Sequence, residues 1–218
     1  MFLLIEAGLF ARTLHSMRSM DLGFDRDHVA TFTLRPDHKT REGNPAPFEQ
    51  TMVAEARQIP GVDSAAFAQL GLLRDTGMKT TVGLPGERVT KAQFMNSSLN
   101  AVSPEYFDTM GIRMVQGRGL ATTDRFVEGR PTPVVVNQTL ARRFFPAQDP
   151  VGKVLGTGSG ILKATHQIVG VSSDSQYRSL REPVPPTYYG PFSGEYGSAN
   201  ILHLRAAGDP CDTDCSRP

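Results

Sequence analysis

Histidine and cysteine are the residue types in this chain best suited to bind a metal ion or to act as a nucleophile. The histidines are scattered along the sequence: His15, His28, His38, His166 and His203. No two of them stand at the H-x-x-x-H or H-E-x-x-H spacing that lets one helix hold an ion. Cys211 and Cys215 lie in a polar stretch at the end, without a further ligand to complete a site. The sequence therefore predicts no metal centre.

A glycine-rich stretch at residues 156–160 (GTGSG) is a candidate phosphate loop. It lacks the Gly-Lys-Ser/Thr ending of nucleotide-binding loops, and no good helix follows to offer its N-terminus, so a hairpin turn is favoured. No G-x-S-x-G elbow marks a hydrolase nucleophile. Glu49 and Glu55 share a predicted helix with Arg57, which indicates a solvated face. We therefore predict no catalytic, cofactor-binding or metal-binding residue and no enzymatic activity.

Composition excludes several partners. The chain has 218 residues, of which 39% are hydrophobic and 21% charged, and its formal net charge is +1. No global field attracts nucleic acid. Trp is absent and Tyr numbers 5, which argues against a platform for stacking bases or sugars. The length allows a real core, in one large domain or two small ones.

The stretch at residues 131–154 (PTPVVVNQTLARRFFPAQDPVGKV) predicts three consecutive elements from local signals. Three valines after a proline indicate a short buried strand. Asn137 offers its side-chain oxygen as the N-cap of a short helix. The apolar pairs of that helix lie one turn apart: Leu140 with Phe144, and Ala141 with Phe145. Pro146 ends the helix, and a turn at 149–152 leads into the next strand.

The other expected elements alternate between strands and helices. Strands are predicted at residues 28–34, 62–68, 79–84, 92–101, 112–116, 166–172, 187–191 and 200–205. A helix is predicted at 48–59, where apolar residues repeat at helical spacing before Pro60 and Gly61. A second, short helix follows Ser103, which we expect to be its N-cap, and ends at Gly111 in the left-handed conformation. These elements make two β-α-β units.

The first twenty residues (MFLLIEAGLFARTLHSMRSM) are apolar at helical spacing, interrupted by Glu6. The apolar run is about half the roughly 20 residues that a complete membrane span needs. It also lacks the basic start and cleavage site of a signal peptide. Two interpretations stay open: an ordinary amphipathic helix, or the last turns of a span. Arg12, His15 and Arg18, placed where such a span would leave the lipid, favour the second.

Five stretches in one register resemble a known family. They are 7–25 (AGLFARTLHSMRSMDLGFD), 59–69 (IPGVDSAAFAQ), 102–120 (VSPEYFDTMGIRMVQGRGL), 134–155 (VVVNQTLARRFFPAQDPVGKVL) and 166–192 (HQIVGVSSDSQYRSLREPVPPTYYGPF). Over about residues 7–208 the chain resembles the MacB-like periplasmic core domain of bacterial ABC-transporter permeases. The likeness is to the duplicated orphan permeases of the FtsX-like permease family.

This resemblance implies an α+β fold with porter-like β-α-β units and an inserted second α/β subdomain. Residues 25–120 with 199–208 would form the porter-like subdomain, and 121–198 the inserted one. Residues 1–24 would be the end of a transmembrane or membrane-exit helix, and 209–218 a tail. The shortened start and the unfamiliar ending CDTDCSRP lead us to expect a fragment of such a permease.

The implied function is that of an extracytoplasmic domain of an ABC-type export or lipoprotein-release permease. It would transmit conformational change across the bacterial inner membrane without catalysis or cofactor. A separate ATP-binding cassette subunit or domain, a periplasmic adaptor and a second copy of the chain would be its partners, and nucleic acid would not. One alternative is a soluble periplasmic binding module for a small apolar ligand or peptide, held between the two parts. Another is an enzyme of unknown class, which would need perturbed titratable groups gathered in a cleft.

Overall fold

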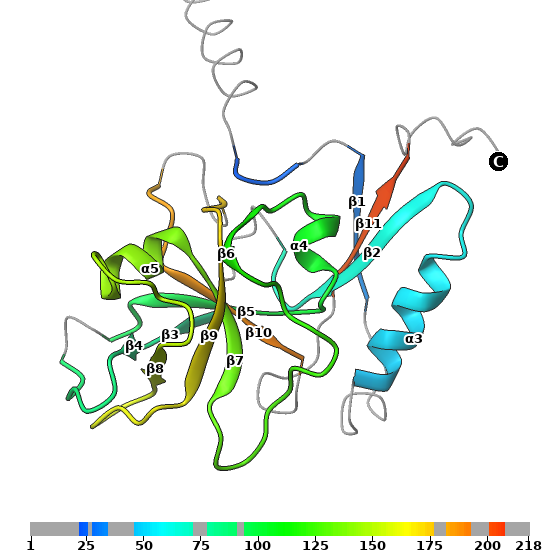
Figure 1. Ribbon diagram of the computed structural model, residues 1–218. Helices are drawn as coiled ribbons and strands as arrows, with labels where there is room; N and C mark the ends of the chain where they lie inside the picture. The colour runs from blue at the N-terminus through cyan, green and yellow to red at the C-terminus, as the bar shows by residue number, and fades with distance from the viewer. Residues whose placement is uncertain are drawn as a thin grey trace, which may run out of the picture.

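The structure, a computed structural model, describes residues 22–25, 28–34, 46–71, 78–90, 94–176, 182–192 and 201–207. Three helices are labelled in Figure 1: α3 (Ala46–Ala56), α4 (Tyr106–Thr109) and α5 (Gln138–Phe144). The first strands are β1 (Val29–Thr33), β2 (Val62–Ala68), β3 (Met78–Thr80), β4 (Val82–Gly83), β5 (Ser97–Val102) and β6 (Met114–Gly117). The later strands are β7 (Thr132–Asn137), β8 (Val154–Thr157), β9 (His166–Ser172), β10 (Thr187–Pro191) and β11 (Ile201–Ala206).

The described strands join in one curled sheet in the order β1-β11-β2-β5-β10-β7-β9-β8-β4, with β3 paired to β5 and β6 paired to β9 (Figure 1). Parallel pairs, β5 with β10 and β7 with β9, alternate with antiparallel ones. The fold is therefore mixed α+β and largely strand, as the sequence predicted for its class. No helix among the described residues is long and apolar enough to cross a membrane.

The first predicted β-α-β unit is confirmed, but it also includes a strand from the far end of the chain, which the local sequence does not indicate. β1 and β2 both pair antiparallel with β11, so the last strand of the described chain lies between them. Helix α3 packs Val53 and Ala56 against Phe67 of β2 and Leu202 of β11. The unit is thus held together by a strand about 140 residues further along the chain than β2.

The stretch at 131–154 is built as its local signals predict. The three valines of β7 are fully buried, and the Asn137 side chain accepts a hydrogen bond from the Leu140 N–H at 2.9 Å. Leu140 and Ala141 of α5 pack with Val134 and Val136, whereas Val135 belongs to a second cluster with Tyr106 of α4. Because successive side chains of a strand point to opposite faces, α5 and α4 cover opposite faces of the sheet.

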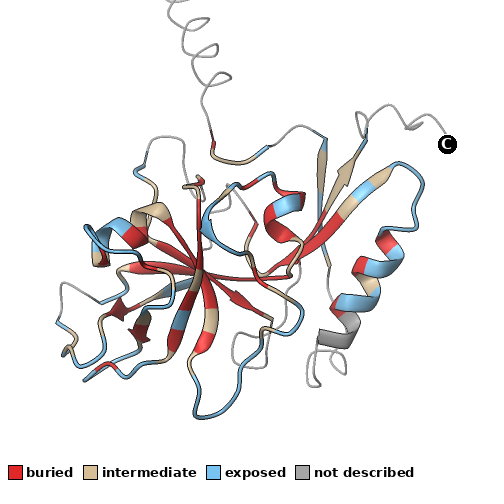
Figure 2. Ribbon diagram, in the orientation of Figure 1, coloured by how far each residue is buried: buried red, intermediate tan, exposed pale blue. Residues whose placement is uncertain are grey.

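The central strands of the sheet are buried on both faces. Every residue of β5 and of β10 is buried, and Figure 2 shows this band of buried residues across the middle of the sheet. Tyr188 of β10 joins the α5 cluster and Tyr189 the α4 cluster. The core is therefore two layers divided by the sheet.

The predicted role of Ser103 as an N-cap is wrong. Helix α4 begins after Glu105, which makes no side-chain capping bond. The Ser103 hydroxyl instead accepts a hydrogen bond from the N–H of Phe67, at 3.1 Å, and so ties the end of β5 to β2. The end of the helix is as predicted, because Gly111 has a φ of +64°.

The two strands of the second predicted β-α-β unit lie further apart in the sheet than those of the first. β5 and β6 flank α4 in sequence, but β10, β7 and β9 lie between them in the sheet. Strands of 121–198 therefore pair with strands of 25–120, at β10 with β5, β9 with β6 and β8 with β4. The division into two subdomains stays a prediction, and the sheet is continuous across its boundary.

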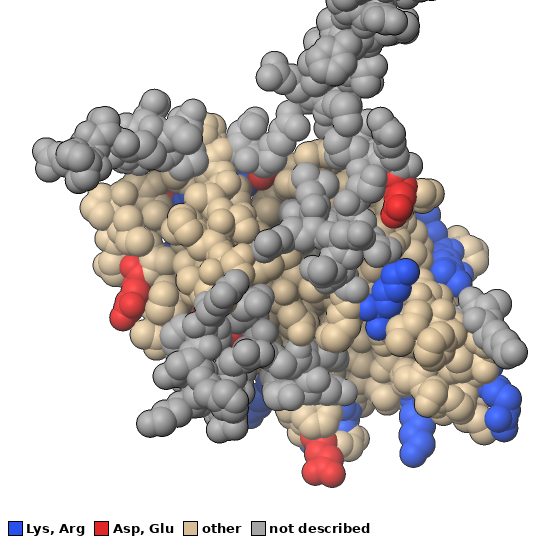
Figure 3. Space-filling view, turned by 180° about the vertical axis from the view of Figure 1, so that it is seen from behind, with Lys and Arg blue, Asp and Glu red and all other residues tan. Residues whose placement is uncertain are grey.

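The reverse face carries dispersed charges. In Figure 3 the visible Lys and Arg side chains lie mostly on the half of the molecule that holds β4 and β8, and visible Asp and Glu side chains stand apart from one another. Residues 1–21 and 208–218 lie outside the described residues, so the predicted membrane-exit helix and tail are not tested there.

Candidate functional site

The three histidines that the structure describes do not form a common metal-ligating group. His166 begins β9, His203 is on β11, and His28 precedes β1 with a φ of +65°. His166 contacts the Thr165 hydroxyl at 2.8 Å, and His203 contacts the Thr31 hydroxyl at 3.1 Å. No group of three or more His, Cys, Asp or Glu residues converges within the described part of the chain. His15, His38 and both cysteines lie outside it.

Both buried imidazoles are neutral at physiological pH. Burial lowers the pKa of His166 and of His203 to about 4, because desolvation disfavours the charged ring. Each ring also packs edge-on against a tyrosine, Tyr188 for His166 and Tyr106 for His203. These contacts make both histidines part of the core.

Glu49 departs from its prediction. We expected a solvated helix face, and Glu55 is indeed exposed, but Glu49 is only 3% exposed. Glu49 shares a face of α3 with Val53, one turn later, and that face is turned toward the sheet. The pattern of charges did not reveal which face of α3 is covered. The buried carboxylate lines a cavity.

That cavity, the α3 groove, has a volume of about 170 Å³. It lies between α3, the turn from β5 into α4, the segment after β6 and the end of β10. Its apolar lining includes Val53, Val102, Leu120 and Phe192, and its charged lining is Glu49, Arg57, Glu105 and Asp124. The groove thus combines an apolar body with charged groups at its walls.

Arg57 and Arg118 each pair with a carboxylate that lines the α3 groove. Arg57 lies 3.6 Å from Glu105 and joins α3 to the start of α4. Asp124 receives two hydrogen bonds from Arg118, at 2.6 and 3.0 Å, and one from the Ala121 N–H at 2.9 Å. These donors lower the pKa of Asp124 although its burial opposes them. Asp124 is therefore ionised and fully engaged with its own loop.

A second feature, the end clamp, joins the two ends of the described domain; it consists of residues 22–25, Thr109, Met110 and Arg205. Arg205 of β11 donates from Nη1 to the Asp25 carboxylate at 2.8 Å and from Nε to the Thr109 carbonyl oxygen at 2.8 Å. The N–H of Asp25 bonds the carbonyl oxygen of Met110 at 2.9 Å. The chain entering before β1 and the chain leaving after β11 are therefore fixed to α4 at one place.

Close packing holds the other side of the end clamp. Leu22 is buried, and its carbonyl oxygen accepts a bond from the Gln176 N–H at 2.9 Å. Gly23 has a φ of +71°, and a Cβ built on it would lie 1.8 Å from the Asp174 carbonyl oxygen. Only glycine fits both the left-handed backbone and this contact. Residues 22–25 are therefore seated on the segment after β9 as well as on α4.

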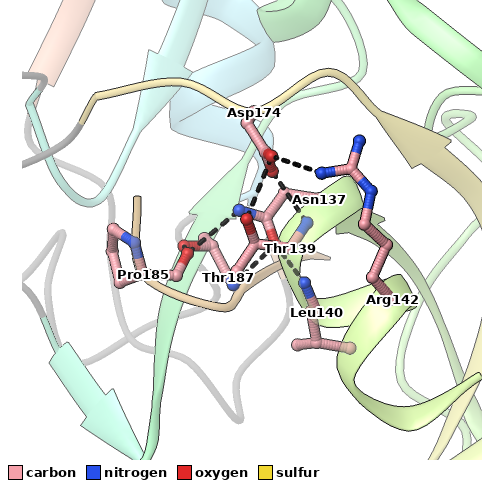
Figure 4. Close-up of polar contacts among 7 residues, drawn as sticks. All are labelled: Asn137, Thr139, Leu140, Arg142, Asp174, Pro185 and Thr187. Atoms are coloured by element: carbon pink, nitrogen blue, oxygen red, sulfur yellow. Dashed lines mark hydrogen bonds and ion pairs between the residues drawn. The ribbon is translucent and has the colours of Figure 1, made fainter. Parts of the chain in front are cut away.

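The segment after β9 is in turn tied to the start of α5 (Figure 4). The Asp174 carboxylate accepts bonds from the Thr139 N–H at 2.8 Å and hydroxyl at 3.0 Å, and lies 3.6 Å from Arg142. The Asn137 oxygen also accepts a bond from the Thr187 N–H at 2.9 Å, and its amide donates to the Pro185 carbonyl oxygen at 2.9 Å. The end clamp is thus connected through hydrogen bonds to the middle of the sheet.

Two solved structures are similar to this chain. Among solved structures, the periplasmic region of MacB from Actinobacillus actinomycetemcomitans has a TM-score of 0.52 and 16% identity, over 84% of this chain and 76% of that one. The extracellular domain of the noncanonic ABC-type transporter YknZ from Gram-positive bacteria has a TM-score of 0.48 and 16% identity, over 82% of each chain. Among curated proteins, none matches significantly.

The fold is a mixed α+β domain, largely strand, with a curled sheet like that of the MacB periplasmic region. A family model, the MacB-like periplasmic core domain, matches residues 8–206. The chain therefore belongs to the MacB-like periplasmic core domain family, as the resemblance in its sequence predicted.

Proposed function

We propose that this chain is the extracytoplasmic domain of an ABC-type export or lipoprotein-release permease, and that it transmits conformational change across the membrane without catalysing a reaction. Family membership supports the setting. The observation that carries the mechanical role is the end clamp. Arg205 and Asp25 are 180 residues apart in sequence yet hydrogen-bonded, so both chain ends of the domain meet α4 at one point.

The end clamp gives the membrane-facing segments a short route into the domain. In our proposal residues 1–24 include the end of a transmembrane helix, and further spans of the permease follow the domain. A displacement of either segment acts on β11, which is a strand of the sheet, and on α4, which packs directly on the sheet. Packed units of this kind move together rather than deforming continuously.

The proposed partners follow from this setting. An ATP-binding cassette subunit or domain would supply the energy, a periplasmic adaptor would contact the outer surface, and a second copy of the chain would form a homodimer. The domain would lie on the periplasmic side of the bacterial inner membrane, with 121–198 as an inserted subdomain of the porter-like unit.

The test measures movement of the domain in the complete permease, assembled with its ATPase in nanodiscs. A fluorophore is attached at Arg130→Cys, an exposed loop position, after Cys211 and Cys215 are replaced by serine. Its distance from the bilayer is followed by energy transfer to a labelled lipid. We expect ATP to change the transfer in the wild type and the Arg205→Met variant to weaken that change while ATP hydrolysis continues. Unchanged transfer in a wild type that hydrolyses ATP would refute the mechanical role.

The α3 groove supports a second candidate function, a binding module for a small ligand. It lies between α3 of the predicted porter-like part and residues 120–124 and 191–192, at or within the predicted inserted part. Ligand sites form preferentially at such boundaries. The two roles are compatible in one domain.

A further inference from the structure

We propose that the α3 groove binds a small neutral molecule with an apolar body of about one ring, such as an aromatic alcohol. This inference rests on the second candidate function and names its ligand class. The α3 groove is outside the end clamp, so its occupancy is a separate property from the mechanical role. Three features of the groove carry the assignment: its volume, its apolar walls and the pairing of its charged side chains.

The volume of the α3 groove sets the size of the ligand. An apolar protein cavity of about 150 Å³ accommodates one benzene molecule. The α3 groove, at about 170 Å³, therefore has room for a single ring with a short substituent. Molecules with two fused rings or a long acyl chain exceed this volume.

Apolar side chains from separate elements form the walls of the α3 groove. Val53 of α3 and Val102 of β5 are buried, and Leu120, in the segment after β6, is only 6% exposed. Phe192, which follows β10, packs against the same core cluster as Val53 and adds an aromatic side chain. A ring that enters the groove removes apolar surface from water on the ligand and on these walls, which favours binding.

The charged side chains of the lining already have partners. Arg57 pairs with Glu105. Asp124 is held by Arg118, and Glu49 also has an interaction partner within the protein. An ionised ligand would lose hydration on entering the groove and would find these countercharges engaged, so its burial costs free energy that a neutral molecule does not lose. The lining therefore favours a neutral ligand over a cation, a carboxylate or a phosphate.

The test measures the affinity of four probes by isothermal titration calorimetry on the 218-residue chain. 2-Phenylethanol is the neutral one-ring probe, and 2-(1-naphthyl)ethanol is the neutral two-ring probe. Phenethylamine and 3-phenylpropanoate carry one ring with a positive or a negative charge. We expect 2-phenylethanol to bind most tightly and each of the other three to bind at least about tenfold more weakly, which corresponds to about 1.4 kcal/mol.

The size limit, the charge and the binding module are tested separately by these probes. Equal or tighter binding of the naphthyl probe would overturn the size limit, and equal or tighter binding of either charged probe would overturn the assignment of a neutral ligand. Failure of 2-phenylethanol to bind would overturn the binding module itself. The mechanical proposal would then be intact, because its energy-transfer assay needs no ligand.

Two tryptophan variants locate the site. Ala54→Trp, at an exposed position of the lining, should fill the groove and reduce the affinity for 2-phenylethanol at least about tenfold without replacing a buried side chain. Glu55→Trp, at the next residue of α3, is exposed but outside the lining, so this matched control should leave the affinity unchanged. Equal affinity in the wild type and in a folded Ala54→Trp variant would place binding elsewhere and overturn the proposal.

Discussion

Replacing Asn137 with alanine should destabilise the domain by more than the loss of a single hydrogen bond would. The side chain is 1% exposed and serves three backbone groups: the N–H of Leu140, the N–H of Thr187 and the carbonyl oxygen of Pro185. Alanine leaves both N–H groups without this acceptor in a buried place. Each stranded donor costs about 1–3 kcal/mol, and loss of an N-cap alone costs about 1 kcal/mol.

We therefore expect a loss of about 3 kcal/mol in the free energy of unfolding, from a typical total of about 5–15 kcal/mol. With a urea m-value of about 2 kcal/mol/M, the midpoint should fall by about 1.5 M. The assay is urea unfolding followed by far-ultraviolet circular dichroism, since the chain has no Trp. The m-value should not change, because the same surface is exposed on unfolding.

Two further variants separate the components of this loss. Asn137→Ser keeps an oxygen able to cap the Leu140 N–H but is too short to serve Thr187 and Pro185 as well, so it should recover only the cap, about 1 kcal/mol. Thr139→Ala removes one half-buried hydroxyl bond to Asp174 and should cost about 1 kcal/mol. If Asn137→Ala lowered the midpoint no further than Thr139→Ala, the bridge to β10 would contribute nothing and the reasoning would fail.

Three other perturbations test the end clamp and the core. Gly23→Ala should lower the free energy of unfolding by at least about 2 kcal/mol, because the new methyl group meets a carbonyl oxygen. Gly61→Ala, where φ is +86° but the space is open, should lower it by only about 1 kcal/mol. Equal losses of the two variants in urea unfolding would contradict this. Arg205→Met should cost about 1–2 kcal/mol, mostly through its bond to a backbone carbonyl, since its carboxylate partner is 50% exposed; no loss would show that the clamp is not formed. Burial lowers the pKa values of His166 and His203 to about 4 in the folded protein. As the pH falls, these two imidazoles therefore become protonated in the unfolded chain before they do in the folded one. Stability should be constant above about pH 6.5 and fall as the pH drops toward 4, by about 2 kcal/mol per histidine at pH 5, and His203→Asn should flatten the profile.

Elements with strong local signals were predictable from the sequence. The bounds of β9 and β10 agree with the predicted ranges 166–172 and 187–191, because both contain β-branched or aromatic residues and turn-forming residues follow β9 and precede β10. Asn137 was recognisable as a cap since an N-cap needs only its own backbone and the next turn. Such features are decided within about ten residues.

Features decided by distant partners were not predictable. Ser103 looks like a cap, but the N–H of Phe67 competes for its hydroxyl across the sheet. Glu49 has the sequence context of a solvated charge, but packing of α3 on β2 buries it. The insertion of β11 between β1 and β2 depends on a strand remote in sequence. A single sequence contains no periodicity that reports such contacts, and both candidate sites consist of them.

The end clamp and the α3 groove share one short element, α4. Its flanking residue Glu105 lines the groove at one end, and the carbonyl oxygens of Thr109 and Met110 bind the clamp at the other. A shift of α4 would therefore alter both, and coupling between two sites is reciprocal. We expect Arg205→Met to change the Kd of the α3 groove for a small apolar probe, 2-phenylethanol, by about threefold or more, and the bound probe to alter the ATP-driven movement of the domain. An unchanged Kd in a folded Arg205→Met variant that has lost the clamp would show that α4 holds the two sites independently.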